Sequence, residues 1–562
     1  MDWTPQVCVF HAEDPHSSFK ARISVSIAIA ACFAGRRPIL MRLRTTRTFV
    51  LLAAALCLPS LASAQMLARP GWAGSGITTD AWWNQAVFYQ IDPLSFQDSN
   101  GDGFGDLKGI LARLDYIQSL GVDAILLSPL EPHPPAVTTA AGTTTAAHGE
   151  QVFDPTYGTN EDFDALVQQA AARKIRVLVD LPLSGAQTVD ALTGVARFWL
   201  TRGVAGLRLV RDAGDQAAGV TALTPFQIAD RVRALRALAN GFAGQRILVG
   251  DLIAESPATP WSAAAVPASA PPAPAPAAPS RRGNRMRRGG TVASAQPDQP
   301  AYGPSDSQPQ LQVDSHIALL PAMHAADLRQ ALTLATQPLH GPGPAPVLAS
   351  DANGRTRSMD RYADGKNDLN IARMLAAVLL TAKTSTLLYF GQELGMTTGT
   401  AKPASGSSTE SSPMQWGAKS PFTTGTPWLD SPASAATVNV EAEEADPQSL
   451  LRWYRQLSTM HHGNPVLRDG AMTILPTTNP DVVAWARRPL KGEALPVVVI
   501  CNLSGAEVKL SMKEELAKAQ LHGFFFRTLM RSGVDAIVAG PASVDAVTLP
   551  PYGTYIGELH LK

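Results

Sequence analysis

The chain has 562 residues, with 47 lysine and arginine residues against 47 aspartate and glutamate residues, so its formal net charge is zero. A chain of this length can bury a large core and form more than one domain. The charge balance excludes a global basic field of the kind that attracts nucleic acid, and it also excludes a strongly acidic, solvated chain. We therefore expect a globular protein that does not bind nucleic acid.

The N-terminal region has the order of an export signal. Residues 41–64 contain three arginines, then the apolar run FVLLAAALCL, then Ala-Ser-Ala before Gln65. This order is typical of a cleaved signal peptide. A membrane anchor is the alternative, but the apolar run is too short to cross a bilayer. Residues 1–40 are interpreted as a misassigned start. We expect a periplasmic or extracellular protein without a transmembrane helix in its mature chain.

From residue 86 onward, short apolar runs alternate with amphipathic helical stretches. This alternation favours parallel strands that are buried on both faces. Eight such runs predict a closed (β/α)8 barrel, also called a TIM barrel, over residues 80–463. The predicted strands are residues 86–91, 122–129, 175–182, 204–210, 246–252, 315–321, 346–350 and 385–390.

Two other regions differ from this pattern. Residues 256–312 contain APPAPAPAAPS followed by RRGNRMRRGG, a composition that cannot bury a core and that predicts a disordered insertion within the barrel. Its arginines could contact an anionic surface, although a solvated basic linker is the simpler interpretation. Residues 464–562 contain strand-like runs such as VVAWARRP and TYIGELH, which predict a C-terminal antiparallel β domain.

The segment DSNGDGFGD places oxygen-bearing side chains at every second position, which is the spacing of the first ligands of an EF-hand calcium loop. The position eleven residues after Asp98 is Gly109 and not glutamate, so the motif is not a complete EF-hand. A polar turn is therefore the alternative to a calcium site. The predicted oxygen ligands are Asp98, Asn100, Asp102, the carbonyl of Phe104, and Asp106.

The stretch WWNQAVFYQIDPLSFQDSNGDGFGDLKGILARLDYIQSLGVDAILLSP resembles the N-terminal barrel segment of glycoside hydrolase family 13, the α-amylase superfamily. The resemblance continues at YGTNEDFDALVQQAAARKIRVLVDL, STLLYFGQELGM and SPMQWGAKSPFTTGTPWLD. The PMQW stretch is similar to the oligo-1,6-glucosidase, α-glucosidase and trehalose synthase branch. The resemblance implies carbohydrate metabolism, α-linked glucosides as ligands, and a structural calcium ion in the DSNGDGFGD loop.

Glycoside cleavage requires two carboxylates across the scissile bond, and a barrel presents them at the C-terminal ends of its strands. The family has an aspartate nucleophile where this chain has Val210, which has no lone pair with which to attack carbon. Arg208, the family's partner of that nucleophile, is retained and needs another acid, plausibly Asp180 or Asp251. Asp251 occupies the general-acid position, where the family has the longer glutamate.

The seventh and third strands also depart from the family. Aligning VLASDANGR on Arg355 puts Ala352 at the position of the acid that stabilises the transition state, whereas a one-residue slip would put Asp351 there. On the third strand Asp180 is kept, but the asparagine and histidine of the family's motif are missing. The chain also runs directly from DLPLSG into the next unit, which implies that domain B, a wall of the family's active-site cleft, is absent.

These departures leave several functions open. The first is a secreted pseudoenzyme that binds an α-glucan, an oligosaccharide or an envelope or secreted protein; the family's amino-acid transporter heavy chains are a precedent. The second is an active α-glucosidase or transglycosylase that uses relocated acids, Asp212 and Asp251, although the simpler interpretation is that Asp212 caps the next helix or pairs with Arg211. A third is a structural partner of the envelope that uses residues 256–312. The predicted substrate contacts are Arg208, Arg355 and Asp180.

Overall fold

The computed structural model describes residues 81–128, 130, 153–211, 220–251, 306–336, 343–351, 356–399, 411–419, 421–533 and 540–561. The predictions for residues 1–64, Asp212, Ala352 and Arg355 lie outside these residues.

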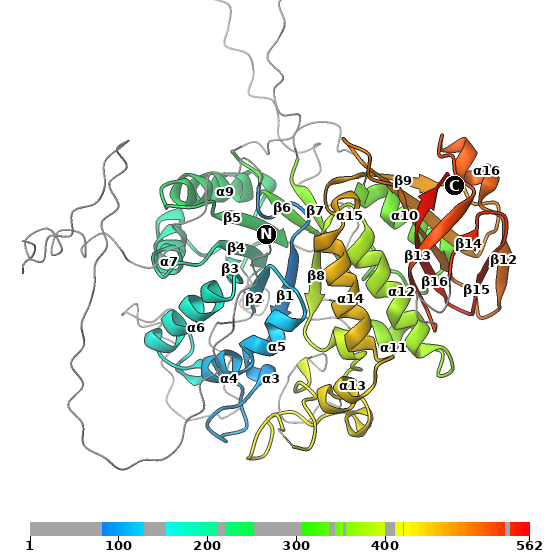
Figure 1. Cartoon of the computed structure of the whole chain (residues 1–562). Coiled ribbons are helices and arrows are strands. Elements are labelled where there is room, and N and C mark those ends of the chain that lie inside the picture. The colour runs from blue at the N-terminus through cyan, green and yellow to red at the C-terminus, as the bar shows by residue number, and fades with distance from the viewer. Residues whose placement is uncertain are drawn as a thin grey trace, which may run out of the picture. The chain divides into compact units, whose positions relative to one another are not determined.

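Eight parallel strands close into a barrel in the order of the chain, which confirms the predicted TIM barrel (Figure 1). Most strand residues are buried, as expected for strands covered by helices on one side and by barrel filling on the other. The strands are β1 (Val87–Ile91), β2 (Ala124–Leu127), β3 (Arg176–Leu183), β4 (Gly206–Arg211), β5 (Ile247–Asp251), β6 (Leu311–Asp314), β7 (Ala345–Ala349) and β8 (Ser385–Tyr389).

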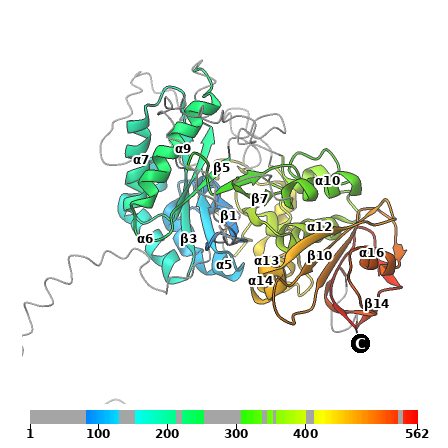
Figure 2. The same ribbon diagram turned by 90° about the horizontal axis from the view of Figure 1, so that it is seen from above.

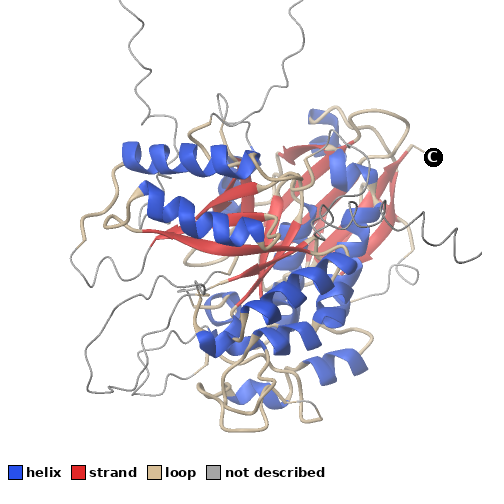
Figure 3. Cartoon of the chain, turned by 90° about the vertical axis from the view of Figure 1, so that its left-hand side faces the viewer, coloured by secondary structure: helices blue, strands red, loops and turns tan. Residues whose placement is uncertain are grey.

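Helices surround these strands, as Figures 2 and 3 show. Side-chain caps fix several helix starts; for example, Thr159 and Asp162 form a capping box at the first turn of α6. Among the helices that the structure describes, none combines the length and the apolar character needed to cross a membrane. The α-helices of the barrel region are α3 (Pro93–Phe96), α4 (Leu107–Ala112), α5 (Leu114–Ser119), α6 (Asn160–Ala172), α7 (Val189–Thr201), α9 (Pro225–Asn240), α10 (Ala325–Thr336), α11 (Ser358–Tyr362), α12 (Asp368–Thr381), α13 (Val440–Ala445), α14 (Leu450–Gly463) and α15 (Pro465–Asp469). Short 3₁₀ helices are η1 (Pro155–Tyr157), η2 (Gln392–Leu394) and η4 (Ala433–Ala436).

The sixth strand lies earlier than predicted. The prediction placed it at residues 315–321, but that segment forms a turn that follows β6. The Asp314 side chain accepts a hydrogen bond from the His316 backbone N–H at 3.0 Å, which bends the chain away from the sheet. The predicted boundary of the insertion, residue 312, was therefore also wrong, because it falls inside β6.

The connection from β3 to α7 is short, which confirms the predicted absence of domain B at this position. Only residues 184–188 join the two elements. Arg231 of α9 is buried and donates to the carbonyl oxygens of Ser184 and Gln187 at 3.4 and 2.6 Å. Helix α9 thus fixes the short connection between β3 and α7.

The C-terminal region forms the predicted antiparallel domain. A six-stranded sheet has the order β14-β13-β16-β11-β10-β9, and β12 pairs with β15 in a second sheet. Its elements are β9 (Ala471–Leu475), β10 (Val482–Arg488), β11 (Val497–Asn502), β12 (Val508–Leu510), α16 (Lys513–Lys518), β13 (Phe525–Arg531), β14 (Ala542–Ser543), β15 (Val547–Leu549) and β16 (Thr554–His560).

Candidate functional site

A polar layer lies inside the barrel, above its apolar filling. Leu178 of β3 and Val249 of β5 belong to the apolar cluster that fills the barrel. Because strand side chains two residues apart share a face, Asp180 and Asp251 point into the barrel one layer closer to the C-terminal ends. Arg208 of β4 is directly opposite Asp180 on β3. The predicted acids and arginine are therefore brought together at the barrel end where this fold carries its active sites.

Arg208 is the centre of this layer. Its Nε and Nη2 donate to the two carboxylate oxygens of Asp180 at 2.7 and 2.8 Å. Its Nη1 donates to Asp251 Oδ2 at 3.0 Å and to Gln90 Oε1 at 3.2 Å. Its Nη2 also donates to Ser128 Oγ at 2.6 Å. A guanidinium has five N–H donors, so these five hydrogen bonds use its full capacity.

The electrostatics of the layer follow from this pairing. Burial opposes the charge of Arg208, but the carboxylates of Asp180 and Asp251 outweigh burial and raise its pKa above the ordinary arginine value. The prediction that Arg208 pairs with Asp180 or Asp251 is confirmed, since the structure contains both ion pairs. The bidentate pair with Asp180 has the geometry of the stronger of the two.

The strand-end position that the sequence analysis predicts for the nucleophile is occupied by an apolar side chain. Val210 is in register with Asp251 on β5 and with Pro182 on β3, and it is half-buried. The valine side chain at residue 210 has no oxygen atom that could attack a carbon atom. Asp251, at the position that the sequence predicts for the general acid, has Oδ2 3.0 Å from the Arg208 guanidinium. An adjacent cation favours an ionised carboxylate, whereas a general acid must hold a proton.

Asp351, the acid that follows β7, forms its hydrogen bonds with the first residue of helix α11. Asp351 is buried, and its carboxylate accepts hydrogen bonds from the backbone N–H and the Oγ of Ser358 at the start of α11. Arg361 lies 3.7 Å from the same carboxylate. Burial raises the pKa of Asp351 against the opposing effects of Ser358 and Arg361. Asp351 is therefore held by the local structure at the base of α11.

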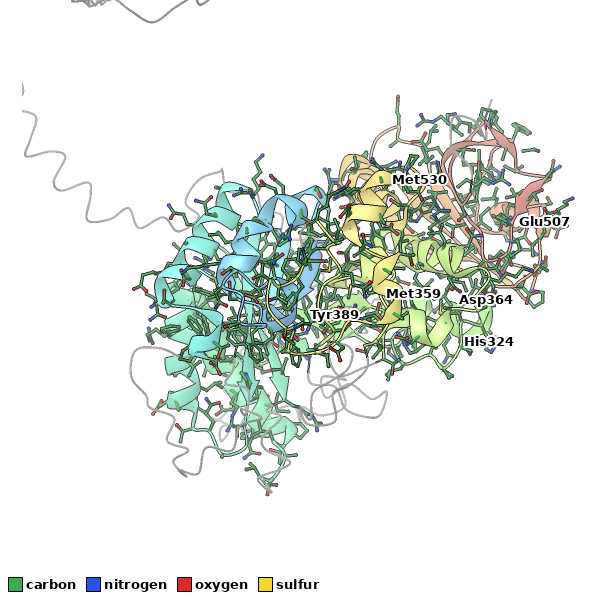
Figure 4. The ribbon with its side chains drawn as sticks, turned by 90° about the horizontal axis from the view of Figure 1, so that it is seen from below. His324, Met359, Asp364, Tyr389, Glu507 and Met530 are labelled. Carbon is green, nitrogen blue, oxygen red and sulfur yellow. The ribbon has the colours of Figure 1, made fainter. Side chains whose placement is uncertain are left out.

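The sequence prediction missed three members of the layer. Gln90 of β1 and Ser128, which follows β2, bind Arg208. Tyr389, labelled in Figure 4, ends β8 and contributes to the electrostatic environment of Arg208. The Tyr389 hydroxyl lies 3.3 Å from Ser411 Oγ. Gln90 could have been found, because it follows the inward-facing Phe88 by two residues on a predicted strand.

The DSNGDGFGD loop is held by its own polar side chains. Asp98 Oδ1 accepts from the backbone N–H groups of Asn100 and Gly101 at 2.9 and 2.7 Å. Its Oδ2 accepts from the Gly103 N–H at 2.8 Å and from Thr423 Oγ1 at 2.5 Å. Although burial has the opposite effect, these donors lower the pKa of Asp98. Asp98 is thus an ionised anchor of the loop.

The other predicted ligands continue the same pattern. Asn100 Oδ1 accepts from the Asp102 N–H, and Asp102 Oδ1 accepts from the Phe104 N–H, each at 2.8 Å. Asp106 caps α4 through the Gly109 N–H at 2.7 Å. These oxygen donors suit a hard cation such as calcium. Within the described residues, however, no group of three or more His, Cys, Asp or Glu side chains is arranged to hold a metal ion. The calcium site therefore stays a prediction.

The comparisons with known proteins agree on one protein family. The profile described as "Alpha amylase, catalytic domain" matches residues 90–184 and 309–470. The matched ranges leave out β4 and β5, which carry Val210 and Asp251.

Curated relatives match along most of the chain. The probable oligo-1,6-glucosidase 2 of Bacillus subtilis is 25% identical over 536 residues, which cover 78% of this chain and 93% of that protein. The trehalose-6-phosphate hydrolase of the same organism is 24% identical and covers 78% of this chain and 92% of its own length.

Solved structures share the fold. The trehalose-6-phosphate hydrolase of Bacillus licheniformis has a TM-score of 0.63 at 19% identity, covering 86% of this chain and 100% of that one. The trehalulose synthase MutB of Pseudomonas mesoacidophila has a TM-score of 0.60 at 20% identity, covering 87% and 100%.

Proposed function

Since the chain belongs to the α-amylase family, glycoside hydrolase family 13, we propose that it is a catalytically impaired member that binds α-linked glucosides without cleaving them. The observation that carries this proposal is the pairing of Arg208 with both Asp180 and Asp251 beside the apolar Val210.

The proposed loss of catalysis has two physical causes. Retaining glycosidases need a nucleophile and a proton donor on opposite sides of the scissile bond. Val210 provides no lone pair at the first position. Asp251 is an unsuitable proton donor at the second, because the adjacent Arg208 guanidinium stabilises its carboxylate form. Asp351, the described acid that follows β7, is occupied by Ser358 and Arg361.

The proposed retention of sugar binding rests on the acceptors that the layer leaves available. A carboxylate offers about four lone-pair sites, and Asp180 uses two of its own for Arg208. Sugar hydroxyls can donate hydrogen bonds to such lone-pair sites. Relatives named as glucosidases and as trehalose-6-phosphate hydrolases support α-glucosides as the ligand class.

Activity through relocated acids is the competing proposal, and it requires Asp212, which lies outside the described residues. In that case Asp212 would replace the nucleophile, and Asp251 would have to release Arg208 to act as an acid. The contact between Arg208 and Asp251 argues against this arrangement.

The decisive experiment measures turnover by the purified chain with calcium present. Substrates are maltose, isomaltose, trehalose, sucrose and an aryl α-glucoside, with Asp251→Asn as the control for contaminating enzymes. We expect no turnover above the control, together with calorimetric binding of at least one of these sugars that weakens in Asp180→Asn. Turnover that disappears in both Asp251→Asn and Asp212→Asn would instead establish the relocated site.

Two further features are proposed on sequence grounds. Calcium would be held by the oxygens of Asp98, Asn100, Asp102, Phe104 and Asp106, and would stabilise the loop. Export is proposed from the order of charged, apolar and small residues in residues 41–64.

A further inference from the structure

His461 of α14 is a buried histidine at the end of the barrel opposite the polar layer. Its Nδ1 lies 2.9 Å from the carbonyl oxygen of Leu380, near the end of α12. Its Nε2 lies 2.8 Å from the carbonyl oxygen of Gln85, just before β1. The ring is 1% exposed, so water does not compete for these contacts.

Both contacts can be hydrogen bonds at the same time only when the ring carries two protons. A carbonyl oxygen can only accept a hydrogen bond, and a neutral imidazole has one N–H and one lone pair. The neutral ring can therefore donate to Leu380 or to Gln85, but its second nitrogen then faces another lone pair. Only the imidazolium form donates to both oxygens.

The two residues that His461 contacts show what the second proton on its ring would stabilise. Gln85 has a left-handed backbone with φ of 60°, an unfavourable conformation for a residue other than glycine. Its backbone is held by His461, while its side chain accepts from Arg487 Nη2 at 3.2 Å. The Leu380 carbonyl lies at the negative end of the α12 dipole, which favours a cation there.

The surroundings set the pH at which the ring gains its second proton. Burial, which is the largest effect, lowers the pKa of His461, and so does the adjacent His462; the two carbonyls and the carboxylate of Asp123 act in the opposite direction. Arg487 is a further cation on the same Gln85. The imidazolium therefore forms on the acid side of about 6.5, the ordinary histidine value.

We propose that His461 is a proton-dependent latch that ties the start of β1 to the end of α12. The imidazolium holds both carbonyls, whereas the neutral ring holds only one. The Leu380 carbonyl, at the negative end of the α12 dipole, keeps the remaining N–H, and the strained Gln85 backbone is released. The barrel base is consequently tighter in acid than at neutral pH.

The test measures the protonation of the His461 ring and the protection of the backbone amides separately, in the full chain. Selective ¹⁵N-histidine labelling should show His461 doubly protonated below its pKa and as a single neutral tautomer at pH 8. Amide hydrogen exchange should show a several-fold rise in protection of the Ala86 N–H, which donates to Trp83 O at 3.2 Å, as the ring is protonated. A ring that stays in one protonation state from pH 5 to 8 would overturn the proposal.

His461→Arg supplies a permanent cation, so the protection of Ala86 should become independent of pH. His462→Arg is the matched control, because His462 contacts the Gly121 carbonyl at 2.9 Å. Protection of Ala86 should keep its pH dependence in this variant, with the midpoint moved further to the acid side by the added cation beside His461. Retention of the wild-type pH dependence in His461→Arg would also overturn the proposal. Global melting is not the readout: a histidine whose pKa is lowered by folding contributes less stability as the pH falls, which would mask a local tightening.

Discussion

At the scale of single residues, one buried arginine determines how the acids around it pair. With valine at residue 210, the Arg208 guanidinium remains buried and must be neutralised within the barrel, because an unpaired buried charge is costly. Asp180 binds it through both oxygens, and Asp251 provides the second ion pair. Asp251 thereby serves Arg208 as a second counter-ion.

A second buried acid gives a prediction on pH. Glu393 is buried, and its Oε1 accepts from the hydroxyls of Tyr89 and Tyr116, each at 2.7 Å. Burial raises the pKa of Glu393 from its usual 4.5 despite these hydrogen bonds. A raised carboxyl pKa contributes stability that is present below 4.5 and is lost as the pH rises through the folded-state value. The neutral Glu393→Gln variant should lack this loss.

Urea unfolding at pH 5 and pH 8 checks this prediction. The wild type should lose more free energy of unfolding than Glu393→Gln over this interval, by about 1.4 kcal/mol for each tenfold change in proton affinity. Glu514→Gln is the control, since its side chain is 80% exposed. Equal pH slopes in the wild type and Glu393→Gln would refute the argument.

At the scale of elements, the DSNGDGFGD loop is braced by a segment far along the chain. The Asp98 N–H donates to the Phe422 carbonyl at 3.0 Å, and the Trp428 N–H donates to the Gly103 carbonyl at 3.0 Å. Gly103 has φ of 93°, and a Cβ there would lie 2.1 Å from the Thr426 carbonyl oxygen. The loop and the segment after PMQW are therefore one structural unit.

Calcium binding by this loop predicts a specific variant. Asp102→Asn keeps an oxygen that can accept from the Phe104 N–H but removes one negative charge. We expect calcium to raise the melting temperature of the wild type, and the calcium concentration that gives half of this effect to rise at least tenfold in Asp102→Asn.

Thermal melting against calcium concentration checks this expectation. Melting without calcium should be nearly the same in both proteins, and Asp115→Asn, an exposed acid outside the loop, should behave as the wild type. A wild-type protein whose melting does not respond to calcium would show that the loop is a polar turn.

At the scale of the whole molecule, two arginines, one half-buried and one buried, connect the C-terminal sheet to the barrel helices. Arg329 of α10 donates to the Val482 carbonyl at 2.8 Å. Arg487 of β10 donates to the carbonyls of Thr381 and Ala382 at 2.8 and 3.1 Å. These carbonyls end α12, where a cation also interacts favourably with the helix dipole.

Removal of Arg487 should therefore destabilise the protein. Arg487→Met leaves the α12 carbonyls and the Gly470 carbonyl, which Arg487 Nη2 contacts at 3.0 Å, without this donor. We expect a loss of about 2–4 kcal/mol in the free energy of unfolding, since unsatisfied buried acceptors cost about 1–3 kcal/mol each and the desolvated charge is relieved in return. Chemical denaturation measures this loss. The neighbouring Arg488→Met is the control, and an equal effect of the two variants would contradict the role of Arg487.

Much of the fold could be predicted from the sequence. The period of apolar runs and helices sets strand and helix identity locally, and strands buried on both faces must pair in parallel, so the barrel follows. The sixth strand was misplaced because SHIALLP is as apolar as a strand, whereas the Asp314 side chain turns the chain through a hydrogen bond that composition does not reveal.

The candidate site, like the fold, could be predicted from the sequence only in part. The sequence by itself determined that residue 210 is a valine and that no domain B follows β3, because these depend only on residue identity and spacing. Only the tertiary structure decided that Arg208 binds Asp180 and Asp251 together, and that Asp351 is committed to Ser358. The Arg208 pairs depend on the register between neighbouring strands, and the Asp351 contact depends on the path of the chain into α11, neither of which residue order alone specifies.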